Sequence, residues 1–465
     1  MRLRQAAKTG IVASAAVLFV AAAPAAIAQH TGSRAAAAPG VTGPVSLHPV
    51  TTTPHLPPND NPPQQIRQIV QCRGTVYVVG TFTTLEQGSK TFVRHNAASF
   101  SARAPYTMTS WAPRINGTVN SIAFNGTNCA DAYIGGSFKK INTTLAQNLG
   151  KISTAAGTGA VVKKFGHSVN GTVQTLRAVG GHLLVGGQYT NINGGKAAPY
   201  LTSVSLVTGK NDKYLNLHIK GNYKFPGSQP NATRVYNQAL SHSGKLDLVM
   251  GDFTSAGGRR RQQIFMLSLG KAQGTVTGWT SPEFDGSQGN LPGGFQYQCS
   301  TDNTFYVRAA AWSPDDKTIY LADTGYRPWN STVTDPRSGL CDSASAWPAT
   351  HKSVLHLWIN YTGCDSLYSV AADASTVYFA GHERWSENPD GCDTEGHDAI
   401  LAPGFEGLSP KTGHLTFNPT RDRGLGADDM LLTKAGLWIA SDNFDHSQAC
   451  GGVENLAGIC LLPYK

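Results

Sequence analysis

The hydrophobic and polar positions of the chain repeat one short phrase, in which three strand-forming residues lead into a glycine pair and an aromatic. The clearest copy spans residues 133–138 (YIGGSF). Similar or weaker copies begin at Tyr77, Leu184, Leu248, Tyr320, Tyr378 and Trp438. The phrase therefore recurs every 51–72 residues. A fixed phrase at such a period is typical of a repeat architecture.

Each repeat predicts four short antiparallel strands. An alternating strand such as 119–124 precedes the phrase, which forms the second strand. A polar loop, a third strand such as 200–206, a Thr-Gly turn and an aromatic-bearing fourth strand follow. No sustained helical period occurs after residue 28.

Seven such repeats predict an all-β chain folded as a single β-propeller of seven four-stranded blades. An open solenoid normally has shorter repeats, and a pair of sandwiches would not carry one phrase throughout. The glycines that end the second strands are expected to avoid a steric collision there and to let the backbone turn.

The two ends of the chain are expected to share one blade. The last repeat provides strands near 430–432, 437–439 and 458–462 before the chain ends at Lys465, so a fourth is missing. Residues 45–50 alternate in polarity and are predicted to supply it, because an unpaired edge is a liability. Residues 54–63 contain five prolines and are assigned to a connection outside the sheets of a propeller spanning 44–465.

The first 28 residues predict a secretory signal peptide. Arg2, Arg4 and Lys8 precede an apolar run over 11–23, and residues 26–28 (AIA) offer a cleavage site. The alternative is an N-terminal membrane anchor. Residues 29–43 are Ala-, Gly- and Ser-rich and predict a flexible leader. The mature protein is therefore expected to be secreted and extracellular, with no membrane span.

The charge of the chain does not predict a nucleic-acid partner. The sequence contains 38 Lys and Arg against 29 Asp and Glu, a formal charge of +9, which falls to +6 once three bases leave with the signal. That excess is modest for this length. The basic run 259–261 is interpreted as a solvated turn.

The cysteines predict disulfides rather than a metal site, because an even number in an exported chain favours bridges and no Cys-x-x-Cys spacing occurs. They are Cys72, Cys129, Cys299, Cys341, Cys364, Cys392, Cys450 and Cys460. Repeat positions pair Cys72 with Cys129, and Cys450 with Cys460 across one loop. Cys299 with Cys341 and Cys364 with Cys392 are the remaining pairs considered.

Several segments resemble the delta-sixty-type repeat of secreted bacterial β-propellers. They are the phrase 135–138 (GGSF), the loop 191–194 (NING), the Thr-Gly turns, residues 381–385 (GHERW), and the closing segments 418–424 and 436–442. Phe417 and Ala440 depart from the usual Trp and Gly. The resemblance covers about Ile66 to Lys465 and implies the fold and export. The activity of that family is largely undefined, so it implies no catalytic residue.

Candidate ligand-binding residues follow the second strands or precede the first ones, because these positions are expected to meet at the channel mouth. They are His382, Glu383, Arg384, Trp385, Arg421, Arg423, Asp428, Asp442, Asp252 and Asp323. Arginine guanidinium groups can bind a polar ligand bidentately, and an aromatic ring can stack on it. Alternatively, His382 bonds a neighbouring blade, Arg421 and Arg423 form ion pairs between blades with Asp422, Asp428 or Asp442, and Trp385 is a packing residue. No metal or cofactor is predicted.

Three functions are compatible with these residues. The first is a module that binds an extracellular or cell-surface protein or glycan. The second is a polysaccharide hydrolase or lyase that pairs Glu383 with Asp428 or Asp442. The third is an extracellular scaffold. No nucleophile elbow, zinc-binding helix or phosphate loop is present in the sequence, and the fold alone does not decide.

Overall fold

Antiparallel strands provide nearly all the regular structure of the protein. The computed structural model describes residues 45–58, 62–196, 199–222, 232–284, 306–326, 340–419, 423–444 and 456–465. Within these ranges the only helical element is the short 3-10 helix η1 (Pro282–Phe284). None of the described helical structure is long and apolar enough to cross a membrane. The predicted signal peptide (1–28) and leader (29–43) lie outside the described residues.

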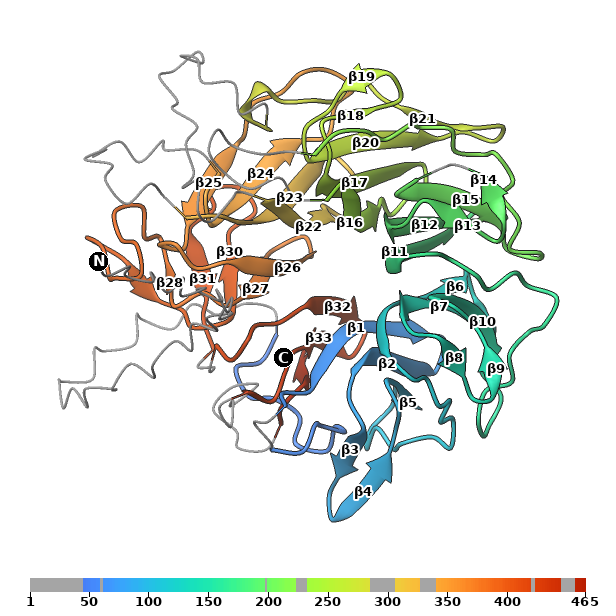
Figure 1. The fold of residues 1–465 in the computed structure, drawn as a ribbon. Helices are drawn as coiled ribbons and strands as arrows, with labels where there is room; N and C mark the ends of the chain where they lie inside the picture. The colour runs from blue at the N-terminus through green and yellow to red at the C-terminus, as the bar shows by residue number, and fades with distance from the viewer. Residues whose placement is uncertain are drawn as a thin grey trace, which may run out of the picture. The chain divides into compact units, whose positions relative to one another are not determined.

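Seven sheets share one plan in residues 41–465, in which the first strand is innermost. The seven inner strands are β1 (Gln65–Cys72), β6 (Thr118–Asn125), β11 (Thr172–Val179), β16 (Arg234–Leu240), β22 (Tyr306–Trp312), β26 (Leu367–Ala372) and β32 (Asp429–Thr433). Each inner strand contacts the inner strand of the sheet before and after it, and β32 contacts β1. The sheets are arranged around a common centre, so the fold is a β-propeller (Figure 1).

The repeated phrase forms the second strand of every sheet, as the sequence predicts. These strands are β2 (Thr75–Thr81), β7 (Asn128–Ser137), β12 (His182–Gln188), β17 (Leu246–Asp252), β23 (Thr318–Thr324), β27 (Val377–Gly381) and β33 (Gly436–Ala440). The third strands are β5 (Ala97–Ser101), β10 (Leu149–Ser153), β15 (Leu201–Ser205), β20 (Ile264–Leu269), β24 (Ser343–Pro348), β30 (Glu406–Leu408) and β34 (Ile459–Pro463).

A regular fourth strand is present in three sheets rather than in all of them. The three are β21 (Gly274–Val276), β25 (Trp358–Tyr361) and β31 (Leu415–Phe417). Elsewhere in the described residues single bridges occupy the outer edge, such as Phe100 with Met108 and Ile152 with Val161. The outer segments there form too few ladder bonds to continue as strands.

Five sheets carry a small hairpin between their second and third strands. The hairpins are β3 (Thr84–Gln87) with β4 (Lys90–Val93), β8 (Lys140–Ile141) with β9 (Thr144–Leu145), β13 (Asn191–Ile192) with β14 (Gly195–Lys196), β18 (Ser255–Ala256) with β19 (Arg259–Arg260), and β28 (Trp385–Ser386) with β29 (Ile400–Leu401). Because each follows the end of a second strand, the hairpins lie toward the same face as the starts of the inner strands.

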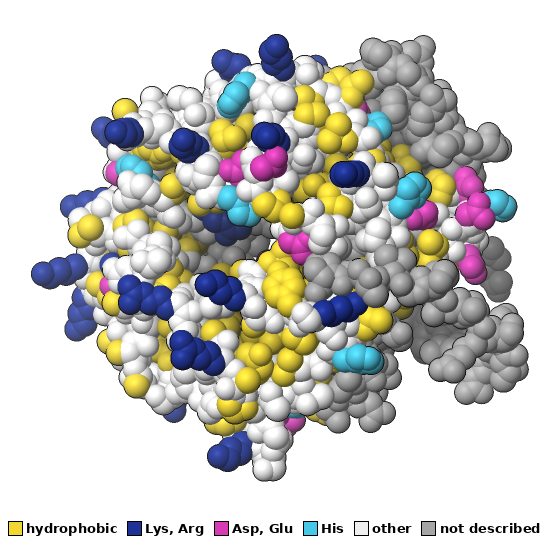
Figure 2. Space-filling model, turned by 180° about the vertical axis from the view of Figure 1, so that it is seen from behind, with side chains coloured by type: hydrophobic (Ala, Val, Ile, Leu, Met, Phe, Trp, Pro, Cys, Tyr) yellow, Lys and Arg dark blue, Asp and Glu magenta, His cyan; other side chains and the backbone are white. Residues whose placement is uncertain are grey.

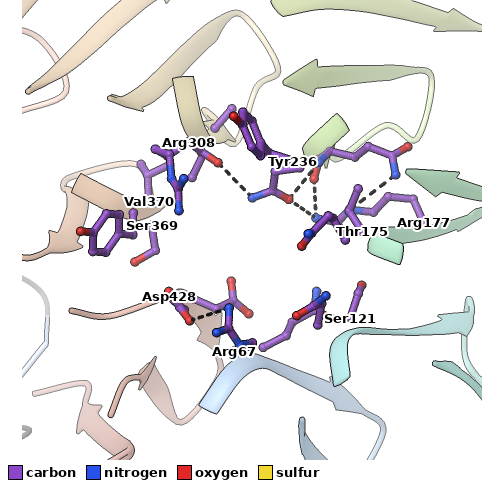
Figure 3. A pocket seen from close by; sticks show the side chains of 18 residues that line it. Arg67, Ser121, Thr175, Arg177, Tyr236, Arg308, Ser369, Val370 and Asp428 are labelled. Carbon is purple, nitrogen blue, oxygen red and sulfur yellow. Dashed lines mark hydrogen bonds and ion pairs between the residues drawn. The ribbon is translucent and has the colours of Figure 1, made fainter. Parts of the chain in front are cut away.

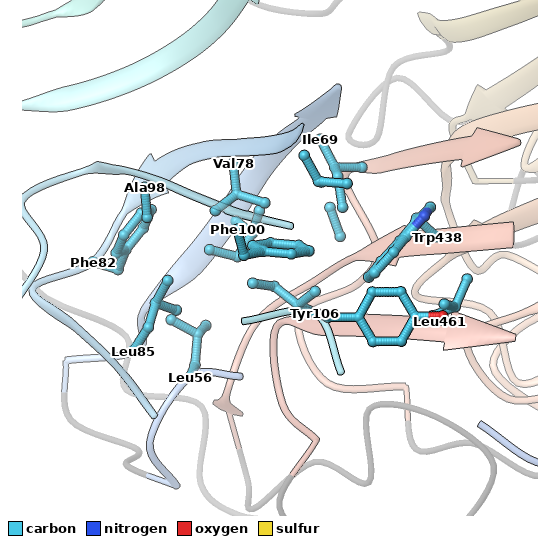
Figure 4. Packing of buried hydrophobic residues seen from close by; sticks show 14 of the residues in the cluster. Leu56, Ile69, Val78, Phe82, Leu85, Ala98, Phe100, Tyr106, Trp438 and Leu461 are labelled. Carbon is cyan, nitrogen blue, oxygen red and sulfur yellow. The ribbon is translucent and has the colours of Figure 1, made fainter. Parts of the chain in front are cut away.

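The hydrophobic core is divided into seven clusters, each between two successive sheets. The cluster between the last and first sheets is shown in Figure 4. Trp438 of β33 lies 5.4 Å from both Phe100 and Tyr106, measured between ring centroids. This packing joins residues more than 300 positions apart in the sequence.

The N-terminal segment lies along the edge of the last sheet. Val45 forms a bridge with Tyr464, the Ser46 amide donates to the Pro463 carbonyl at 2.6 Å, and the Val50 amide donates to the Leu461 carbonyl at 2.9 Å. These contacts support the predicted closing strand, but only one residue pairs regularly. Closure by residues 45–50 stays a prediction, tested below.

The phrase glycines are explained by a β-bulge in the paired inner strand. A Cβ added to Gly80, Gly136 or Gly187 would lie 2.0–2.2 Å from a carbonyl oxygen of that strand. None of these glycines has the left-handed φ that would favour glycine. The expected collision is therefore confirmed, while the expected backbone turn is not the reason for glycine here. Close approach of two backbones at the bulge is the reason.

The described cysteines are all disulfide-bonded. Cys72 at the end of β1 bonds Cys129 near the start of β7, and Cys364 bonds Cys392, which confirms both predicted pairs. Cys341 and Cys460 are also disulfide-bonded. The partners predicted for them, Cys299 and Cys450, lie outside the described residues.

Candidate functional site

The inner strands carry a β-bulge near their first residues, and the bulged side chains line a central cavity. Six inner strands shift register at this point, from β1 to β26. The bulged residues, with the equivalent residue before β32, are Arg67, Asn120, Gln174, Tyr236, Arg308, Tyr368 and Asp428. All seven line a cavity of about 170 Å³. A bulge re-aims a side chain, so these residues form the ring that a ligand would meet first.

The residue after a bulge also lines the cavity, but where it is polar it bonds a neighbouring sheet, and these side chains form a belt. Gln68 accepts a hydrogen bond from the Ile122 amide at 2.6 Å, and Ser121 accepts one from the Leu176 amide at 3.0 Å. The Asp429 carboxylate accepts one from the Ile69 amide at 3.0 Å, from the last sheet to the first. Each bond satisfies a backbone amide of the neighbouring inner strand. The belt side chains are therefore engaged between sheets, as is Asn120 of the bulge ring, whose amide donates to the Val173 carbonyl at 2.9 Å.

Three bulge residues form an aromatic clamp around a cation. The Arg308 guanidinium carbon lies 5.6 Å from the Tyr236 ring centroid and 5.4 Å from that of Tyr368. Figure 3 shows Arg308 and Tyr236 facing the cavity from adjacent strands. In the described part of the chain, no hydrogen bond or ion pair forms to the Arg308 side chain. The rings therefore fix its position while leaving its donors open to an acceptor.

Two acidic residues of the last sheet also line the cavity, next to Arg67. Asp428 lies 3.9 Å from Arg67, measured between the carboxylate oxygen and the guanidinium nitrogen. Burial raises the pKa of Asp428 to about 6, although Arg67 and Arg308 oppose the shift. Burial likewise raises the pKa of Asp429 to about 7, against the hydrogen bond from the Ile69 amide. The site thus combines fixed positive charge with carboxyls that titrate near neutral pH.

A second polar cluster lies outside the ring and contains four of the sequence-predicted residues. Arg384 binds Asp365 with two nitrogens, at 2.7 and 2.9 Å, and its guanidinium carbon lies 4.6 Å from the Trp385 ring centroid. Arg423 lies 3.7 Å from Asp365 and contacts His382. Burial, followed by the charge of Arg423, lowers the pKa of His382.

This cluster, which we call the rim network, supports the structural alternatives considered for its members. His382 bonds Arg423, which precedes the next sheet. Arg423 pairs with Asp365, which is not among its predicted partners, and Arg384 pairs with the same carboxylate, which is only 3% exposed. The Trp385 ring packs against the Arg384 guanidinium in a cation–π contact. Ligand binding by these residues stays a prediction.

The remaining predicted residues are buried outside the cavity, except Asp428, or are not described. Asp442 accepts backbone hydrogen bonds from Leu425, Gly426 and Phe444. Glu383, Asp252 and Asp323 have fully buried side chains. Asp323 takes the place of the phrase glycine, opposite Val307, and burial raises its pKa well above the usual range. Arg421 lies outside the described residues.

Most of the bulge ring does not follow from the sequence reasoning, which places only Asp428 there. The second strand is one strand spacing farther from the axis, about 4.8 Å, so its end residues point between sheets rather than into the cavity. A sequence signal for the bulge ring exists at the start of each inner strand. There an apolar residue is followed by the variable bulged residue and then usually by a polar one. Val119-Asn120-Ser121 and Val173-Gln174-Thr175 are examples.

Comparisons with known proteins find distant structural neighbours but no related family. No protein-family model matches it, and neither does any curated protein. Among solved structures, the WD40 β-propeller domain of Doa1 has a TM-score of 0.44 and 13% identity, covering 88% of this chain and 96% of that one. U3-55K has a TM-score of 0.45 and 9% identity, covering 90% and 100%. The hydrazine synthase of Kuenenia stuttgartiensis has a TM-score of 0.43 and 10% identity, covering 82% and 94%. Likenesses this weak say nothing about a ligand or an activity.

Proposed function

We propose that this protein is a secreted binding propeller of the delta-sixty type. In this proposal its bulge ring recognises a compact polar group of an extracellular or cell-surface protein or glycan. The clamp of Arg308 between Tyr236 and Tyr368 carries the proposal. An arginine held by two rings, with no ion pair among the described residues, is pre-organised to bind an acceptor group. The disulfides Cys72–Cys129 and Cys364–Cys392 are compatible with an extracellular location.

The size of the cavity limits what enters. A volume of about 170 Å³ accommodates a terminal group rather than a polymer segment. Gln174 adds an amide donor and acceptor to the ring, whereas the Asn120 amide already donates to the Val173 carbonyl at 2.9 Å. A carboxylate-bearing end group therefore fits best, with Arg308 as its bidentate partner and the Gln174 amide as an orienting contact.

The predicted hydrolase pairs are not favoured by the geometry. Glu383 is fully buried, and Asp442 is held by three backbone amides, so neither faces the cavity beside Asp428. Paired carboxylates need to flank a substrate to act as acid and base. Binding is the function that the described residues support.

The test is an array of extracellular proteins and glycans probed with the mature protein, followed by affinity measurements on each hit. Arg308→Gln should weaken binding by about tenfold or more, since it removes a charge-assisted bidentate contact. Tyr368→Phe keeps the ring face and serves as the control, with affinity expected near that of the parent. Hits that bind Arg308→Gln as well as the parent would place the ligand elsewhere. Turnover of a polysaccharide that Asp428→Asn abolishes would replace binding by catalysis.

A further inference from the structure

A second surface, separate from the bulge ring, presents basic side chains on an ordered backbone. It lies on the hairpin of β18 and β19 and on the chain segment beside it, and it contains a cavity of about 800 Å³. Its lining residues are His218, Lys220, Thr254, Ser255, Gly258, Arg259, Arg260 and Gln262. None of these described residues is acidic. Figure 2 shows Lys and Arg spread widely over one face, so the arrangement of bases matters more than their number.

The backbone places two bases in one row. Lys220 pairs with Ser255 across one strand boundary, and Ser255 pairs with Arg260 across the next. Residues directly opposite in a sheet project to the same side. Lys220 and Arg260 therefore flank the Ser255 hydroxyl at about 10 Å, which is two strand spacings.

The segment beside the hairpin extends this basic side. Leu217 and Ile219 are buried in a core cluster, whereas His218 and Lys220 are exposed. His218 and Lys220 are both exposed and line the same cavity as Ser255 and Arg260, so they lie on the side of the row. The Lys220 carbonyl accepts hydrogen bonds from the Thr254 and Ser255 amides at 3.0 and 3.1 Å, so the two segments are tied together.

The chemistry of the lining selects among anionic partners. Bases spaced along an open groove suit a chain with repeated negative charge. The serine, threonine and glutamine side chains suit hydroxyl groups, which sugars carry. Among the described lining residues there is no Phe, Tyr or Trp ring for nucleobases to stack on, and the His218 imidazole is the one aromatic ring.

We propose that this basic groove binds an acidic polysaccharide, with Lys220 and Arg260 contacting successive anionic groups. The bound groups are sulfates or carboxylates, and the chain of the polysaccharide runs across Ser255. This interaction does not depend on the bulge ring.

The experiment uses the mature protein with heparin as the sulfated probe and polygalacturonate as the carboxylated one. Binding to at least one probe is expected, with affinity falling as salt rises, because exposed charges are screened. The double variant Lys220→Gln with Arg260→Gln should bind about fivefold or more weakly, since two phosphate-like contacts contribute strongly to such affinities. Lys220→Arg with Arg260→Lys keeps the charges and should retain binding.

The matched control neutralises two exposed bases of the equivalent hairpin region in the second sheet, Lys139→Gln with Lys140→Gln. It changes the net charge equally and should alter affinity less than about twofold if position matters. Equal losses in both double variants would overturn the proposal in favour of a non-specific charge effect. No binding to either probe, or tighter binding to inorganic polyphosphate or single-stranded DNA, would also overturn it. Arg308→Gln should leave polysaccharide binding unchanged, which separates this result from the fate of the bulge ring.

Discussion

Arg308 and Arg384 lie on the same face of the propeller but in opposite chemical situations. Arg384 in the rim network binds the Asp365 carboxylate bidentately and also contacts Asp393. Arg308 in the bulge ring has two tyrosine faces and no hydrogen-bonded partner among the described residues. The paired Arg384 joins segments of its own sheet, before β26 and after β27, whereas an arginine held by rings retains its donors for a ligand. Whether an arginine has a carboxylate partner therefore identifies the candidate site better than the presence of an arginine alone.

Opening the ring should have the largest effect on both arginines, because their sheets are held in position by their neighbours. Deleting residues 29–55 removes the contacts of Val45, Ser46 and Val50 with the last sheet, and we expect a sharp loss of thermal stability or aggregation. The loss is on the order of several kcal/mol, from two or three apolar side chains and their ladder bonds. Deleting residues 29–43 is the control and should melt like the parent. Identical melting of both truncations would show that the closing strand is elsewhere.

Removing the shared carboxylate of the rim network should be the next largest effect. Asp365→Asn leaves Arg384 and Arg423 without their common partner, and the side chain is only 3% exposed. We expect a loss of about 2–3 kcal/mol in the free energy of unfolding by urea, below the full cost of a buried pair because the arginines are partly exposed. A loss under about 0.5 kcal/mol would contradict a structural role.

The carboxyls of the bulge ring and belt should make stability depend on pH. Burial raises the pKa of Asp428 to about 6 and of Asp429 to about 7. A raised pKa in the folded state means that the folded protein holds these protons longer than the unfolded chain. Their stabilising contribution is therefore complete below pH 4 and is lost as pH rises through 6 and 7.

Between pH 5 and pH 8 this should lower the free energy of unfolding by about 1–2 kcal/mol, discounted for water in the cavity. The change is measured by urea unfolding at each pH. Replacing Asp428 and Asp429 with asparagine should flatten the dependence. A dependence that is unchanged in the double variant would assign it to other buried acids, such as Asp247 or Glu406, whose pKa values burial raises to about 7 and 8.

The smallest expected effect is that of Arg308→Gln on stability. Two cation–π contacts are lost, with a cost of about 0.5–1 kcal/mol in a partly exposed site. The comparison with Asp365→Asn is the informative measurement. If Arg308→Gln were the more destabilising of the two, Arg308 would be structural and the clamp would lose its assigned role.

The sequence by itself determined the repeat and much of the local structure. The phrase that includes Gly136 predicts the second strand of every sheet, and its glycine marks a close backbone approach. The same periodicity pairs Cys72 with Cys129, because equivalent turns in successive repeats lie side by side. These features depend on neighbours in sequence or on equivalent positions in adjacent repeats, so a pattern carries them.

Only the tertiary structure decided which polar residues face the centre. Tyr236, Arg308 and Tyr368 are separated by 60 residues or more, and nothing local distinguishes them from Arg384 or Asp323. Their convergence requires the curvature of the whole ring and the bulge that turns each side chain inward. How far a side chain lies from the centre of the ring depends on how the sheets pack. The alternation of polar and apolar residues in a single strand does not determine that distance.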